Sequence, residues 1–162
     1  MAQNISYLIT PSIIKLPIDI VHFYEKNNTV IPLLMENGAF EDFLKLTSDS
    51  ENIQEFWNEI LNFPTSYEYP TRKAFEYLSR SEVTSFGILY FYDHFIVPPD
   101  TKPILFINSQ RAPLAWDNFM NDTHKLLGCD IFPSHLLNNE SQYWDFYTAE
   151  QAYFTALQQK LQ

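Results

Sequence analysis

Carboxylates stand beside tyrosine or tryptophan in three segments of this chain. A carboxylate next to a ring can bind Arg or Lys through charge and through a cation–π contact at the same time. The pattern therefore predicts contact points for a basic protein. A second interpretation stays open, in which the rings fill the core and the acids are only their solvated neighbours. The candidate partner-binding residues are Tyr67, Glu68, Tyr69, Tyr92, Asp93, Asp100, Tyr143, Trp144 and Asp145.

The composition is consistent with a surface that binds a positively charged partner. The 162 residues include 20 Asp and Glu against 10 Lys and Arg, giving a net charge of −10, and 17% of them are aromatic. The acids are spread along the whole chain. Binding to nucleic-acid phosphates needs a basic footprint, so we expect no nucleic-acid partner, and for the same reason no anionic membrane. A basic protein would be steered towards this surface, although acidity that only maintains solubility is the simpler alternative.

No known catalytic motif appears in the sequence. The four histidines do not form a His-Glu-x-x-His pattern, and there is no Gly-x-Ser-x-Gly elbow. Three glycines are too few for a phosphate-binding loop. We therefore expect no catalytic residues, no metal and no cofactor. Carboxylate pairs such as Glu41-Asp42 leave one alternative open, a small hydrolase acting on a sugar or another small polar substrate.

The clearest helical pattern begins at Ser48. Ser48 and Glu51 have the spacing of a capping box, and the pattern ends at Pro64. Between them, one broad apolar face is formed by Ile53, Phe56, Trp57, Ile60 and Leu61.

Two further helices are predicted at 113–127 and 148–161. Pro113 suits a first helical position, and Gly128 suits a helix stop. Cys129 would then follow a helix C-terminus, where the dipole disfavours a thiolate, so we expect it to be a small buried residue.

The remaining segments give weaker patterns. Helices are expected at 17–27, 38–47 and 71–80. Residues 82–97 fit either a helix or a strand, and helix is favoured. A short strand at 103–107 is expected to pair with residues 5–10. Few glycines and many prolines favour helices joined by stiff turns over tight hairpins.

These patterns predict a mainly α fold, a single compact helical domain over residues 1–162 with room for a small two-stranded β element. The single cysteine rules out an internal disulfide. The first residues lack a secretory signal pattern, and no apolar run approaches the ~20 residues of a membrane helix. A cytoplasmic protein is therefore expected.

In size, acidity and lack of enzyme motifs, the chain resembles bacterial immunity proteins, which include the cognate inhibitors of contact-dependent growth inhibition and other polymorphic toxins. The resemblance covers general character and no family motif, so it assigns no residues. It implies 1:1 binding to a basic toxin domain, typically a nuclease, whose active site the acidic surface would cover. The other classes considered are the small hydrolase and an adaptor or DNA mimic acting on another basic partner.

Overall fold

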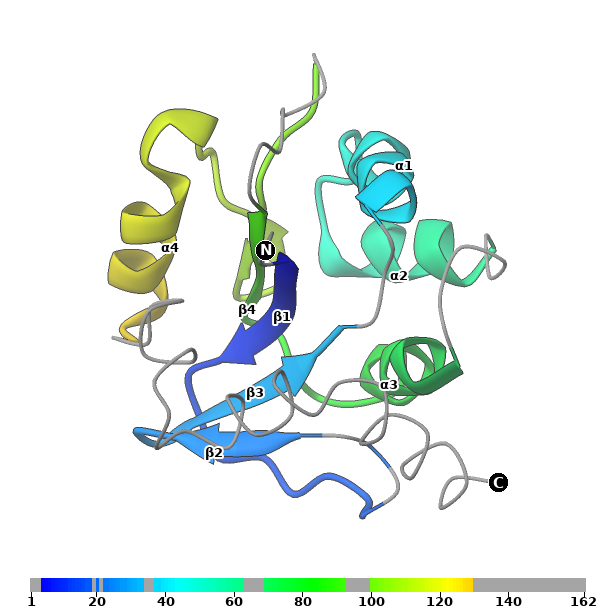
Figure 1. Ribbon diagram of the computed structural model, residues 1–162, viewed down its shortest axis with the longest axis vertical. Coiled ribbons are helices and arrows are strands. Elements are labelled where there is room, and N and C mark those ends of the chain that lie inside the picture. Colours follow the sequence, from blue (N-terminus) through cyan, green and yellow to red (C-terminus); the bar gives the residue numbers. More distant parts are fainter. Residues whose placement is uncertain are drawn as a thin grey trace.

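The computed structural model describes residues 4–18, 20, 22–33, 37–62, 69–92 and 100–129. In this part of the chain a six-stranded antiparallel sheet has the order β2-β3-β1-β4-β5-β6. Helices α1, α2 and α3 lie on one side of it and α4 on the other (Figure 1). The elements are β1 Asn4–Thr10, β2 Phe23–Glu25, β3 Asn28–Pro32, α1 Asn37–Thr47, α2 Ile53–Leu61, α3 Tyr69–Ser79, β4 Phe86–Tyr92, β5 Ile104–Ile107, β6 Gln110–Arg111, the 3₁₀ turn η2 Trp116–Asn118 and α4 Phe119–Leu127.

The prediction of a mainly helical domain is wrong, and the segment 82–97 is the main reason. Its residues Phe86–Tyr92 form β4, in the middle of the sheet. Phe86 and Ile88 pack into the core under α1–α3, while Gly87 faces α4. A strand covered on both faces is apolar at successive positions, so its pattern can be mistaken for a helix.

Two tight hairpins further contradict the expectation that scarce glycine disfavours sheets. The β2–β3 turn places Lys26 and Asn27 at φ 48° and 66°. The β5–β6 turn places Asn108 and Ser109 at φ 49° and 71°. Asn tolerates this left-handed region better than most residues, so the turns form without glycine.

The expected strand pairing was also wrong. Residues 103–107 do contain a strand, β5, and residues 5–10 belong to β1. However, β4 lies between them, and β5 pairs with β4 and β6. The helix predicted at 17–27 is wrong as well, since Phe23–Glu25 form β2 at the sheet edge.

The predicted helices at 38–47 and 71–80 are confirmed as α1 and α3. The helix expected from Ser48 instead begins after Asn52, whose side-chain oxygen accepts a hydrogen bond from the Glu55 N–H at 2.9 Å. Ser48 belongs to the end of α1, because its Oγ donates to the Leu44 carbonyl at 2.6 Å. The apolar face predicted for this helix is largely correct, with Phe56, Trp57 and Ile60 buried and Leu61 exposed.

The helix predicted at 113–127 begins later, at η2 and then α4. Its stop is confirmed: Gly128 has φ 72°, the left-handed conformation that favours glycine. The N–H of Cys129 donates to the His124 carbonyl and that of Gly128 to the Lys125 carbonyl, as in a Schellman motif. Cys129 is buried, as expected. The helix predicted at 148–161 lies outside the described residues.

Aromatic rings dominate the layer between the sheet and α1–α3. The Phe56 ring lies 5.0 Å from that of Phe106 and 5.6 Å from that of Phe86, and the Phe43 ring stacks at 5.8 Å on Phe75. Each large ring buries about 150–250 Å², so this layer supplies much of the apolar stabilisation. The Phe56–Phe106 contact packs α2 on β5, and the residue before α2, Asn52, forms a bridge with Gln110 of the β5–β6 hairpin.

Candidate protein-binding surface

Only part of the sequence-predicted site can be located. Asp100 is exposed and has φ 63°. Tyr69 is the first residue of α3, and Tyr92 is the last residue of β4. The other predicted residues lie outside the described part of the chain, namely Tyr67, Glu68, Asp93, Tyr143, Trp144 and Asp145.

A buried arginine, Arg111, forms hydrogen bonds with the segment that follows Asp100. Arg111, on β6, has only 9% of its surface exposed. Its Nη1 donates hydrogen bonds to the carbonyls of Thr47 and Ser50, at 2.5 and 3.0 Å. Its Nη2 donates to the carbonyls of Lys102 and Pro103, at 3.1 and 3.0 Å. One guanidinium therefore joins the α1–α2 loop to the segment that enters β5.

The backbone strengthens this junction. The Arg111 N–H donates to the Glu51 carbonyl at 2.8 Å, and the Lys102 N–H donates to Ser48 Oγ at 3.1 Å. The indole N–H of Trp116 donates to the Thr101 carbonyl at 2.8 Å, next to Asp100. The two segments are thus bonded to each other, to β6 through Arg111 and to η2 through Trp116.

Two nearby carboxylates, Glu51 and Asp49, partly offset the cost of burying the Arg111 cation. Burial lowers the pKa of Arg111, because desolvation disfavours the cation, while Glu51 and Asp49 act in the opposite direction. An arginine stays charged in proteins despite such a shift. The two carboxylates therefore help to keep a cation beneath the loop.

Four exposed carboxylates lie on or next to the two joined loops. We call this set, Asp49, Glu51, Glu55 and Asp100, the acidic surface. Glu55 accepts hydrogen bonds from the Glu51 N–H and the Asn52 amide, each at 3.0 Å, which fixes its carboxylate beside Glu51. Lys102 forms an ion pair with Glu51 at 3.3 Å.

The sequence did not reveal most of this site. Asp49, Glu51 and Glu55 look like ordinary acids near a helix start, and nothing local singles out Arg111. The Asn52–Glu55 spacing is a capping signal that could have placed Glu55. The contact of Arg111 with residues more than 60 positions away is a tertiary event.

Neither a metal cluster nor a membrane-spanning helix occurs in the described part of the chain. Across the described ranges, no three or more His, Cys, Asp and Glu side chains gather in a way that could hold a metal ion. Within the same ranges, none of the helices has the length and apolar character needed to cross a membrane.

Comparison with protein-family models, curated proteins and solved structures finds no match for this chain.

Proposed function

We propose that this protein binds a basic protein partner through the acidic surface. The observation that carries the proposal is the Arg111 junction, because it joins the backbones of two segments that are distant in the chain and that carry or adjoin exposed carboxylates. Side chains on a rigid backbone lose less conformational entropy on binding, so more of their interaction energy appears as affinity.

The specific form of the proposal is an immunity-type inhibitor acting in the cytoplasm, which binds a cognate toxin domain 1:1. A nuclease must bind phosphates, so its active-site groove is basic. Carboxylates held at Asp49, Glu51 and Asp100 would occupy that groove and exclude the substrate. The net charge of −10 supports fast electrostatically steered association with such a partner.

The first experiment identifies the partner and then removes charge. The tagged protein is used to capture partners from lysate of its source, and the captured protein is identified by mass spectrometry. The Kd is then measured for the triple variant Asp49→Asn, Glu51→Gln, Asp100→Asn. Asn at position 100 tolerates its left-handed backbone. We expect the affinity to fall at least about tenfold, mainly through a slower association rate.

A matched control separates local from global charge. The triple variant Asp42→Asn, Glu59→Gln, Glu76→Gln removes the same number of exposed carboxylates from α1, α2 and α3. We expect it to weaken binding by less than about threefold. Equal losses in the two triples would mean that only net charge matters, and an unchanged Kd in the first triple would remove the acidic surface from the interface.

A further inference from the structure

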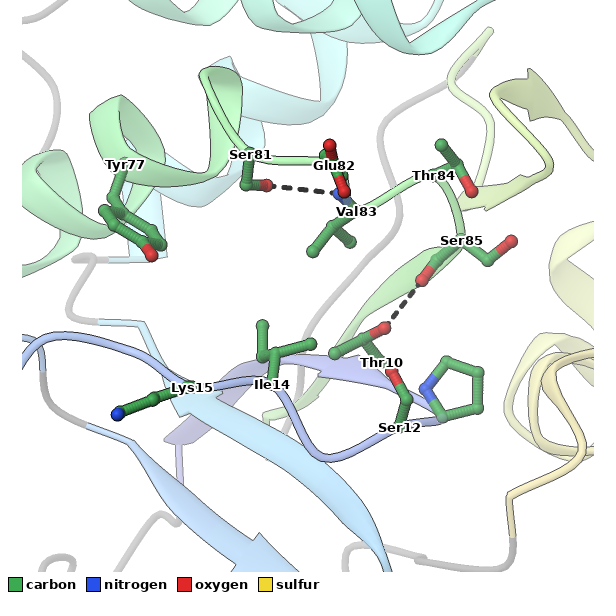
Figure 2. Close-up of a pocket in the computed structure, with 11 residues that line it drawn as sticks. Thr10, Ser12, Ile14, Lys15, Tyr77, Ser81, Glu82, Val83, Thr84 and Ser85 are labelled. Atoms are coloured by element: carbon green, nitrogen blue, oxygen red, sulfur yellow. Dashed lines mark hydrogen bonds between the residues drawn. The ribbon is translucent and has the colours of Figure 1, made fainter.

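A groove lies between the segment that follows β1 and the connection from α3 to β4. It has a volume of about 500 Å³, and its walls include Ser12, Ile14, Lys15, Tyr77 and Val83 (Figure 2). A second pocket of about 470 Å³ shares Tyr77 and Ser81 with it and extends along α3 past Arg80. Ligand sites in proteins typically occupy about 300–1,000 Å³, so the groove can take a small organic molecule.

The middle of the groove is apolar. The side chains of Ile14 and Val83 approach each other from opposite walls (Figure 2), and both are partly buried against the core. The Tyr77 ring, 37% exposed, stands on the α3 wall. These surfaces suit a flat or branched hydrocarbon body.

Hydrogen bonds fix both walls in place. Ile14 donates its N–H to Thr29 Oγ1 at 3.0 Å and accepts from the Tyr24 hydroxyl at 2.8 Å. On the facing wall, the Val83 N–H donates to Ser81 Oγ at 3.3 Å. Thr10 Oγ1 donates to the Ser85 carbonyl at 2.9 Å, which joins the two walls. The groove is thus formed before any ligand arrives.

The polar groups at one end of the groove favour an anion. Lys15 and Glu82 are the charged residues that line the groove, while Lys73, Glu76 and Arg80 line the second pocket. Within the described part of the chain, no side-chain hydrogen bond or ion pair is formed by Lys15, Arg80 or the Tyr77 hydroxyl. In Figure 2, Lys15 and Tyr77 lie at the same end of the groove, on facing walls, while Glu82 lies further along beside Val83.

We propose that this groove binds a small organic acid: a carboxylate carried on an apolar or aromatic body. The body lies between Ile14 and Val83, against the Tyr77 ring. The carboxylate lies at the Lys15 end, where the ammonium group and the Tyr77 hydroxyl donate to it. The groove shares no lining residue with the acidic surface.

The test is an NMR titration of the ¹⁵N-labelled full chain with phenylacetate, indole-3-acetate and hexanoate. Each acid is paired with its neutral amide, and acetate serves as the acid without a body. We expect saturable shifts in the amides of residues 10–15 and 77–85 for at least one acid, with affinity about fivefold above that of its amide. The absence of saturable shifts for all three acids, or equal affinity for acid and amide, would overturn the proposal.

Two lysine variants make the test specific. Lys15→Gln should reduce the affinity for the acid to that for its amide, a loss of about fivefold, and leave the amide unaffected. Lys26→Gln, at the β2–β3 turn, removes the same charge elsewhere and should have no effect. If the two variants behave alike, the carboxylate is not held by Lys15. The charge-neutralised acidic surface should leave the titration unchanged, so this proposal and the proposed function can fail separately.

Discussion

Replacing Arg111 by methionine tests the junction on which the acidic surface depends. Methionine keeps much of the volume of the side chain but removes all its donors. The carbonyls of Thr47, Ser50, Lys102 and Pro103 then lose the hydrogen bonds that Arg111 makes at 2.5–3.1 Å. The cation above the Phe106 ring, 5.7 Å from its centroid, is lost as well.

The expected cost is about 2 kcal/mol in the free energy of unfolding. The Thr47 carbonyl keeps its hydrogen bond from the Ser50 N–H at 3.1 Å, so three largely buried carbonyls lose the partner that Arg111 supplies. Each costs about 1 kcal/mol at the low end, which gives roughly 3 kcal/mol. Removing a desolvated cation returns roughly 1 kcal/mol, in the direction indicated by the lowered pKa of Arg111. For a domain of this size, the net loss corresponds to a fall in Tm of about 4–8 °C.

Urea unfolding followed by tryptophan fluorescence measures the loss, with Lys102→Met as the matched control. Lys102 is an exposed cation at the same junction, and its ion pair with Glu51 joins side chains that are 51% and 67% exposed. Removing it should cost less than about 1 kcal/mol. Hydrogen exchange should also accelerate at the amides of Ser50 and Arg111, which bond within the junction.

The reasoning about Arg111 would be refuted by a methionine variant that unfolds within about 0.5 kcal/mol of the Lys102→Met control. In that case the carbonyls would be satisfied by water, and the loops would be held by their backbone contacts alone.

Three further substitutions test buried contacts of β1, β4 and α4. A Cβ at Gly87 would lie 2.9 Å from Thr123 Cγ2, so Gly87→Ala should cost about 1–3 kcal/mol of stability. Thr123→Ser deletes that methyl group and should recover most of the loss in a double-mutant cycle. Additive costs would contradict the proposed clash. Burial raises the pKa of Tyr7 far above its usual value, and the nearby Cys129 adds to the effect. Above pH 10 the unfolded chain therefore loses a proton that the folded protein keeps, and the free energy of unfolding falls as pH rises. Tyr7→Phe should reduce the slope of unfolding free energy against pH between pH 10 and 11 by up to about 1.4 kcal/mol per unit, and parallel curves for the two proteins would argue against this.

Local sequence patterns predicted the structure correctly where the stabilising interactions join residues that are close in the sequence. The helices at 38–47 and 71–80, the buried face of α2 and the stop at Gly128 depend on residues within a few positions of one another. Prediction failed where contacts join distant segments. Residues 86–92 became a strand because β1 and β5 lie on either side of them, and no local pattern contains that information.

The candidate sites divide along the same line. The sequence alone determined the net charge, the high aromatic content and the absence of known catalytic motifs, because these depend only on which residues are present or on their local order. Tertiary structure decided which acids gather at one place. The segments beside Asp49 and Asp100 are joined through Arg111, whose hydrogen bonds to Thr47 and Ser50 reach across more than 60 residues. Tertiary structure also decided that Ile14 and Val83 face each other across a groove, since sheet pairing and the packing of α3 bring together segments that are distant in the chain.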